Sequence, residues 1–230
     1  MQLETKQSVS EYVRLVDKNC LYFPKGKALI LGLGGGVVAN LFQKHHYNVT
    51  AVEFDNRIID MAKQFFFLND SVKTVCADAR YYINNCQEKF NIVLFDVFKA
   101  EEQPSHVITK ESLTKLKMML DTNGMVLINT HGYLTGTKGL GTQCMIATLK
   151  KAGFDIKICT FSEVEKYRNL LIVATLKPLD ISLNNELYPI MLTDLETVNS
   201  DNKPILEALN ASANQEFRTL YLNNYILRNY

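Results

Sequence analysis

Three carboxylates and a glycine-rich turn are the residues of this chain whose types and spacing are best suited to chemistry. The turn, residues 32–36, reads GLGGG and follows an apolar run at 28–31. The acids Glu53, Asp78 and Asp96 each follow a later apolar segment. Glycines lack side chains, so the backbone of the turn can approach a ligand closely. The acids can accept hydrogen bonds from hydroxyl groups and amines, or offset a positive charge.

The position of Glu53 points to a nucleoside. Glu53 ends the apolar run 49–52 and follows Gly32 by 21 positions. A carboxylate at the tip of the neighbouring parallel strand is well placed to accept hydrogen bonds from ribose hydroxyl groups. The spacing therefore predicts a nucleoside-containing cofactor over Gly32, Gly34 and Gly36. The alternative is a glycine turn that serves only helix–strand packing.

These residues need a sheet that brings them together, and the chain alternates predicted strands and helices. The first, fourth and fifth strands are continuous apolar runs, as expected for parallel strands covered by helices on both faces. The last two strands are joined by a short polar loop, which favours an antiparallel pair at the edge. We therefore predict an α/β fold with a doubly wound, mostly parallel seven-stranded sheet and an antiparallel edge hairpin. The predicted strands cover 28–31, 49–52, 72–76, 92–95, 125–129, 155–161 and 170–175.

Local signals predict where several helices and turns lie. Asp55 and Thr109 are predicted helix N-caps. The helix after Asp55 is predicted to bury Phe65 and Phe66 on its apolar stripe. Residues 123–124, Asn-Gly, are predicted to turn the chain into the fifth strand.

The 230 residues are predicted to form one domain with extensions. An N-terminal helix and linker is expected over 1–26, and a nucleoside-binding catalytic domain over 27–177. A C-terminal helical extension, packed on the same domain, is expected over 178–230. Within it we predict helices at 205–209 and 216–230, and Tyr221, Tyr225 and Tyr230 either pack on the domain or contact a second copy.

Composition and charge exclude several classes of function. The formal net charge is +1, so no global field would attract nucleic acid or an acidic membrane. No signal-peptide core and no run of 18 apolar residues is found in the sequence. The five cysteines are scattered and odd in number, which argues against a disulfide framework or a zinc site. We expect a cytoplasmic protein without bound metal.

The acids also indicate what kind of nucleoside is bound. Asp78 can accept a hydrogen bond from the exocyclic amine of adenine. A sulfonium group carries a positive charge that carboxylates offset, whereas a pyrophosphate would be repelled. The pattern therefore favours a cationic adenosyl cofactor, and NAD(P) is a distant alternative because GxGxxG would need a glycine at Val37.

Four segments resemble a known family. They read LILGLGGGVVANLF, VTAVEFDNRIIDMAKQFF, VCADARYYI and FNIVLFDVF. Their order is similar to that of spermidine synthase-like proteins, which are aminopropyltransferases on the class I S-adenosylmethionine methyltransferase-like Rossmann fold. Residues 96–132 resemble bacterial synthase-like domains, and SDNKPILEAL at 200–209 resembles an acidic-then-proline motif near the family's C-terminus.

The resemblance implies a role for each candidate residue. The donor would be S-adenosylmethionine or its decarboxylated form, and the acceptor a small-molecule amine. Asp96 would orient and deprotonate the attacking amine, with His131 and Val97 against the acceptor. The implied donor-binding residues are Gly32, Gly34, Gly35 and Gly36 beneath the donor, Glu53 at the ribose, and Asp78 with Ala79 at the adenine edge.

Three departures from the family pattern keep other functions open. Polyamine synthases usually have an aspartate at the position of Gly35 and a second acid at the position of Lys99, and only about 26 residues precede the first strand here. We expect aminopropyl transfer to an amine in polyamine metabolism. The alternatives are an S-adenosylmethionine-dependent methyltransferase of unknown acceptor and a catalytically inactive nucleoside-binding scaffold.

Overall fold

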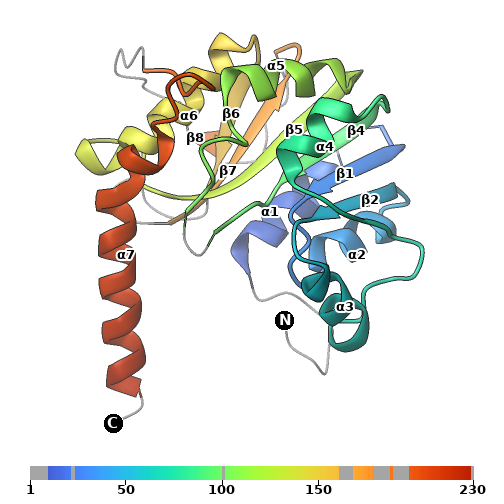
Figure 1. Cartoon of the computed structure of the whole chain (residues 1–230), viewed down its shortest axis with the longest axis horizontal. Helices are drawn as coiled ribbons and strands as arrows, with labels where there is room; N and C mark the ends of the chain where they lie inside the picture. Colours follow the sequence, from blue (N-terminus) through green and yellow to red (C-terminus); the bar gives the residue numbers. More distant parts are fainter. Residues whose placement is uncertain are drawn as a thin grey trace.

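A single mixed β-sheet runs through the centre of the molecule (Figure 1). The computed structural model describes residues 10–21, 24–99, 102–160, 168–178, 187–188 and 197–228. The strand order is β3-β2-β1-β4-β5-β7-β6-β8. The strands are β1 (Lys27–Leu31), β2 (Asn48–Glu53), β3 (Lys73–Cys76), β4 (Phe90–Phe95), β5 (Leu120–Gly132), β6 (Asp155–Cys159), β7 (Arg168–Thr175) and β8 (Leu187–Tyr188).

The predicted fold is confirmed. Strands β3, β2, β1, β4 and β5 are parallel, and β7 pairs antiparallel with both β5 and β6. The two-residue strand β8 extends this seven-stranded arrangement beyond β6. The strand order reverses between β1 and β4, and in open α/β sheets ligands bind at such a reversal.

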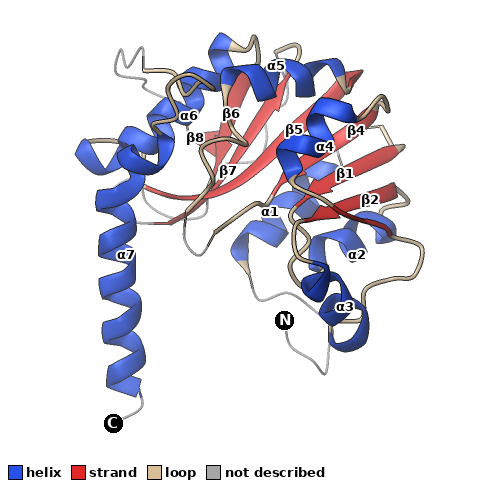
Figure 2. Ribbon diagram, viewed as in Figure 1, coloured by secondary structure: helices blue, strands red, loops and turns tan. Residues whose placement is uncertain are grey.

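Helices cover both faces of the sheet (Figure 2). Successive residues of a buried strand point to opposite faces, so each strand contributes to two cores. On β1, Leu29 and Leu31 pack with α4, α5 and α6, whereas Ala28 and Ile30 pack with α1, α2 and α3. The helices are α1 (Glu11–Cys20), α2 (Val37–Lys44), α3 (Asn56–Phe65), α4 (Ala79–Asn85), α5 (Lys110–Met118), α6 (Leu140–Lys151), α7 (Leu206–Arg228) and the 3₁₀-helix η1 (Thr137–Gly139).

The two predicted helix caps are present. The Asp55 side chain accepts from the Arg57 N–H, and the Thr109 hydroxyl accepts from the Ser112 N–H. Among the described helices, none combines the length and the apolar character that crossing a bilayer requires.

Two local predictions were wrong. The Asn-Gly pair at 123–124 does not precede β5 but lies inside it. The pairing with β4 steps from Phe90 opposite Leu120 to Ile92 opposite Met125, so residues 121–124 form a bulge. Phe65 is 60% exposed rather than buried, because α3 ends at this residue and the helical stripe ends with it.

The C-terminal segment forms one helix instead of the two that were predicted. Helix α7 is continuous, and Leu206 and Ala213 are buried in its first half. Its second half projects past the body of the molecule (Figure 1). An added Cβ at Gly141 of α6 would lie 1.7 Å from Asn210 Oδ1, so this glycine allows α7 to approach. Of the tyrosines considered for dimer contact, Tyr221 and Tyr225 have side chains outside the described part, and Tyr230 lies outside it altogether.

A fully buried asparagine, Asn199, connects the start of α7 to the domain through hydrogen bonds. The Asn199 amide donates to the carbonyls of Ser105 (2.8 Å) and Ile108 (2.7 Å). Its side-chain oxygen accepts from the N–H groups of Ile205 (2.8 Å) and Leu206 (3.3 Å). One side chain therefore satisfies four backbone groups that would otherwise be buried without partners.

Replacing this asparagine should loosen the C-terminal helix. Asn199→Ala leaves buried backbone groups unpaired, and we expect it to cost about 3 kcal/mol of unfolding free energy. Urea denaturation measures this loss, and limited proteolysis should show earlier cleavage near residue 200. The control is Asn202→Ala at an exposed position, which should change the stability by less than about 0.5 kcal/mol. Equal stabilities of the two variants would contradict the role of Asn199.

Candidate active site

The glycine turn follows β1 at the point where the strand order reverses. Gly32, Gly34 and Gly36 have φ angles of +91°, +50° and +73°, which favour glycine. A Cβ on Gly32 would lie 2.3 Å from the carbonyl oxygen of Asp96, so the turn touches the end of β4. A Cβ on Gly34 would meet no atom within 4 Å. The turn is thus tightly packed at Gly32 and open to solvent or a ligand at Gly34.

Glu53 is fixed against this turn. One carboxylate oxygen accepts from the Leu33 N–H (3.0 Å) and the other from the Asp55 N–H (3.2 Å). The side chain is partly buried at the end of β2. Each oxygen has a second lone pair, so the carboxylate can still accept hydrogen bonds from a pair of hydroxyl groups. The geometry fits the predicted contact with a ribose.

Asp78 is the N-cap of α4 and lies one strand further along. Its Oδ1 accepts from the Tyr81 N–H at 2.9 Å, and its Oδ2 lies 3.2 Å from Nε2 of His106. Partial burial opposes ionisation, but the hydrogen bonds from Tyr81 and His106 outweigh it and lower the pKa of Asp78. Asp78 is therefore an ionised cap, and Ala79 beside it is the buried first residue of α4.

Asp96 is held by two hydrogen bonds from distant parts of the chain. The Tyr12 hydroxyl donates to Oδ2 and the Asn129 amide donates to Oδ1, both at 2.8 Å. Burial raises the pKa of Asp96, and these two hydrogen bonds act against the rise. Burial and the nearby Asp96 carboxylate raise the pKa of Tyr12, so its hydroxyl remains a donor. The result is a carboxylate with fixed orientation and an increased tendency to accept a proton.

Tyr12 was not among the predicted site residues. It lies on α1, next to the buried Val13, and packs partly against the core on that face. The sequence places this tyrosine beside the apolar stripe of an amphipathic helix. Because a half-buried tyrosine hydroxyl usually has a hydrogen-bond partner, this position could have indicated that Tyr12 bonds to some other group. Nothing in the local sequence indicated that this partner is Asp96, 84 positions away.

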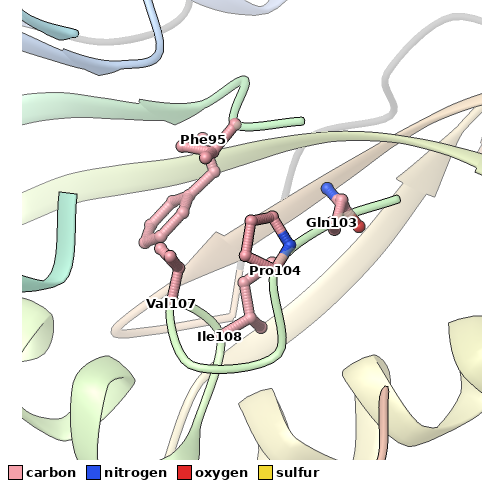
Figure 3. A pocket seen from close by; sticks show the side chains of 6 residues that line it. Phe95, Gln103, Pro104, Val107 and Ile108 are labelled. Carbon is pink, nitrogen blue, oxygen red and sulfur yellow. The ribbon is translucent and has the colours of Figure 1, made fainter. Parts of the chain in front are cut away.

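The two predicted acceptor-binding residues lie just beyond β4 and near the end of β5. Val97 directly follows Asp96 and lines a narrow hollow that has no room for a water molecule; Figure 3 shows this hollow. His131 lies on β5, two residues beyond Asn129, with its ring between those of Phe98 and Phe217. The hollow is smaller than the clefts that bind drug-sized ligands. Its lining residues are Phe95, Val97, Gln103, Pro104, Val107 and Ile108.

The acidic-then-proline segment at 200–209 is linked by hydrogen bonds to the loop at 102–109, which lines this hollow. Arg80 of α4 donates to both carboxylate oxygens of Asp201, at 2.9 and 2.6 Å. The same guanidinium donates to the His106 carbonyl (3.0 Å) and to the Thr109 hydroxyl (2.7 Å). Arg80 therefore has a structural role, with Asp201 as its carboxylate partner. The loop is connected to α4, whose cap is Asp78.

One group of possible metal ligands lies away from the strand ends. It consists of Asp17 and Cys20 of α1 with His45 at the end of α2. His45 Nε2 lies 2.5 Å from an Asp17 oxygen, so these two already satisfy each other. Burial, together with the nearby Asp17, raises the pKa of Cys20 to about 12. The group forms a contact between α1 and the end of α2.

Comparison with protein families agrees with this arrangement. The model of the spermine/spermidine synthase domain matches residues 13–180. The chain belongs to this family. The matched range begins one residue after Tyr12 and includes the rest of α1, the glycine turn, and the strand ends bearing Glu53, Asp78 and Asp96. The family assigned by resemblance is therefore confirmed.

Individual relatives and solved structures cover parts of the synthase-family chain. The polyamine aminopropyltransferase of Vibrio vulnificus is 33% identical over 137 residues, which are 55% of this chain and 45% of that protein. The chain thus spans less than half the length of this relative. A probable spermidine synthase from Corynebacterium glutamicum superposes with a TM-score of 0.69 at 17% identity, covering 81% of this chain and 71% of that one. Human methyltransferase-like protein 13, in complex with SAH, gives 0.61 at 22% identity, with 74% and 84% covered. At these identities the two structures show the shared fold.

Two positions differ from the usual pattern of the synthase family. An added Cβ at Gly35 would lie 3.4 Å from the Phe66 ring, so a side chain here has ordinary contacts. Lys99 is exposed, and its backbone pairs with that of Glu102 in a small bridge. The space for the usual acids is present, but their negative charges are missing from this chain.

The close packing of Gly32 predicts a large difference between two glycines of the turn. In Gly32→Ala the new methyl group would overlap the Asp96 carbonyl, so we expect a loss of at least about 3 kcal/mol and a displaced Asp96. Gly34→Ala has open space and only the cost of its positive φ, about 1 kcal/mol. Chemical denaturation of both variants tests this order. A smaller loss for Gly32→Ala than for Gly34→Ala would contradict it.

Proposed function

We propose that the protein is a transferase that moves an aminopropyl group from an adenosyl-sulfonium donor to an amine. The observation that supports this most is the carboxylate of Asp96, which Tyr12 and Asn129 orient beside the glycine turn. Membership of the spermine/spermidine synthase domain family supports the reaction class. The product would be an N-aminopropyl amine, which is a compound of polyamine metabolism.

The proposed donor is decarboxylated S-adenosylmethionine. The open side of Gly34 leaves room for a nucleoside over residues 32–36, and Gly35 and Gly36 would lie beneath it. We assign the ribose to Glu53 and the adenine edge to Asp78 and Ala79. A donor of this kind supplies an electrophilic carbon next to a positively charged sulfur, and breaking that carbon–sulfur bond leaves a neutral thioether.

Asp96 would act on the incoming amine. The nitrogen must lose a proton as it forms the new carbon–nitrogen bond, and a carboxylate within hydrogen-bond reach can accept that proton. Tyr12 and Asn129 occupy one lone pair on each oxygen and fix the direction of the remaining ones. Positioning would provide much of the rate, because a sulfonium is already a good leaving group.

Methyl transfer from S-adenosylmethionine is the second candidate. It is favoured by Gly35, because the decarboxylated donor bears an ammonium group with no neighbouring carboxylate of its own. An acid in the turn would offset that charge, and glycine does not. Human methyltransferase-like protein 13, which shares the fold, was crystallised with SAH.

We also propose a domain organisation, an assembly and a cellular compartment for the protein. Residues 27–177 would form the catalytic domain, α1 would contribute Tyr12 to it, and 178–230 would form an extension on the same domain. The described cysteines are all free, which suits the reducing cytoplasm, where we place the protein. We propose a homodimer as its assembly and no metal in its reaction.

Donor affinity tests the choice between the two reactions. We expect the protein to bind decarboxylated S-adenosylmethionine more tightly than S-adenosylmethionine in calorimetric titrations. Gly35→Asp adds a carboxylate beside the donor ammonium and should raise this preference by roughly tenfold. Gly35→Asn, of similar shape without charge, is the control and should not change it. A clear preference of the unmodified protein for S-adenosylmethionine would establish the methyl alternative instead.

The pH dependence of transfer tests the role assigned to Asp96. Its carboxylate accepts a proton only when ionised, so activity should fall as the pH drops through its pKa. Tyr12→Phe removes a hydrogen bond that stabilises the ionised form, which raises this pKa, and the acidic limb of kcat/KM should move up by about one pH unit. Tyr81→Phe, at an exposed tyrosine, is the control and should leave the limb in place.

Asp96→Asn provides the second arm of that experiment. It should lower transfer by at least about 100-fold, the usual range for a lost general base. Its thermal stability should be unchanged or higher, because a buried charge has been removed. A rate close to that of the unmodified protein would remove Asp96 from the mechanism.

A further inference from the structure

We propose that the acceptor is an amine with a single ammonium group and an apolar, preferably aromatic, body, rather than a diamine. This inference rests on the proposed function, since it assumes that the amine reaches Asp96. It follows from the aromatic side chains that lie near the Asp96 carboxylate and from the ion pairs that the neighbouring acids already form.

The register of β4 and β5 defines the direction in which an acceptor would extend. Phe95 lies opposite Ile128, so one step further places Asp96 opposite Asn129, and their hydrogen bond agrees with this. Phe98 lies three residues beyond β4, and its ring contacts that of His131. Asn129 and His131 are both in β5, and side chains two residues apart on a strand share a face at about 7 Å. The ring pair is therefore the next layer beyond the carboxylate.

Helix α7 adds a third ring to this layer. The centroids of Phe98 and His131 are 5.2 Å apart, and those of His131 and Phe217 are 5.5 Å apart, with both pairs close to edge-to-face. All three side chains are partly exposed, so the group has a surface that a ligand can contact. We call these residues the aromatic group. An amine held at Asp96 would place its carbon chain against it.

The acids nearest the aromatic group are already paired with cations. Glu216 forms an ion pair with Lys138 and accepts from the Tyr133 hydroxyl at 2.9 Å. Glu102 lies 3.7 Å from a guanidinium nitrogen of Arg218. Asp96, in contrast, has two neutral partners, Tyr12 and Asn129. Among these three described acids, Asp96 can therefore match one ammonium group, whereas use of Glu216 or Glu102 for a second would displace an existing ion pair.

Lys99 also disfavours a second ammonium group on the acceptor. Where the family usually has a second acid, this chain has an exposed cation three residues after Asp96. A second ammonium on the acceptor would meet a like charge there instead of a carboxylate. An alkyl or aromatic end in the same place is favoured by burial of its apolar surface. Charge and apolar contact thus select the same class of acceptor.

Equilibrium binding of matched amines tests this without requiring turnover. The full-length protein is saturated with 5′-methylthioadenosine, the thioether left by the proposed reaction, and amines are titrated calorimetrically. n-Pentylamine and 1,4-diaminobutane have equal numbers of non-hydrogen atoms and differ only in a terminal methyl or ammonium group. We expect n-pentylamine to bind at least tenfold more tightly than the diamine, and 2-phenylethylamine to bind more tightly still.

Two variants link the preference to the aromatic group. Phe217→Ala should weaken 2-phenylethylamine binding by roughly tenfold, whereas Phe65→Ala, at an exposed phenylalanine of α3, should not. Phe98→Glu adds a carboxylate next to His131 and should shift the preference toward 1,4-diaminobutane. Phe98→Gln is its uncharged control and should not. This gain of diamine binding cannot be produced by misfolding.

Each outcome is decisive. Tighter binding of the monoamines, reversed by Phe98→Glu, supports the inference even if mass spectrometry then detects no transfer, and in that case only the proposed reaction fails. Equal or tighter binding of 1,4-diaminobutane overturns the inference while aminopropyl transfer stands. If the nucleoside binds but none of the three amines does, the inference is also overturned.

Discussion

The close contact between Gly32 and the Asp96 carbonyl is the constraint on which the rest of the site depends. A methyl group at residue 32 would lie 2.3 Å from that oxygen, so the turn after β1 and the end of β4 can meet only if this residue is glycine. The Gly32 N–H donates to the Val52 carbonyl at 2.8 Å, which connects the same turn to β2. Three strand ends are thereby joined at the reversal of strand order. The glycine turn, Glu53 and Asp96 become neighbours for this reason.

Asp96 combines two opposing requirements. Burial raises its pKa and makes it a better proton acceptor, but the same burial penalises the ionised form that must accept the proton. Tyr12 and Asn129 reduce this conflict, because their hydrogen bonds stabilise the carboxylate without adding a positive charge. A lysine or arginine in their place would lower the pKa much further and would compete with a cationic amine for the carboxylate. Neutral donors therefore suit a group proposed to bind and deprotonate an ammonium.

In the proposed function, the C-terminal segment contributes to the acceptor side of the site. Asn199 and Asp201 connect the loop over residues 102–109 to α4 and to the start of α7. Helix α7 then brings Phe217 to the ring of His131 and Glu216 to Lys138. If the proposed acceptor site is correct, this segment contributes to the apolar surface and the charges that an acceptor meets. Since one fold can serve several reactions, a change in this segment can alter the acceptor without altering the donor side.

Sequence alone determined the features that depend on nearby residues. The apolar runs, the glycine turn and the caps Asp55 and Thr109 gave the parallel sheet, its edge hairpin and three of its acidic strand ends, because periodicity and capping act over a few positions. The same short range explains the errors at residues 123–124 and at Phe65, where pairing with β4 and the end of α3 overrode the local pattern. Only the tertiary structure decided what surrounds Asp96. Tyr12 is 84 positions from it and Asn129 is 33, and the ring of Phe217 reaches His131 through a helix predicted as two pieces. These contacts follow from the order of strands and the packing of α1 and α7, which no local pattern in the chain specifies.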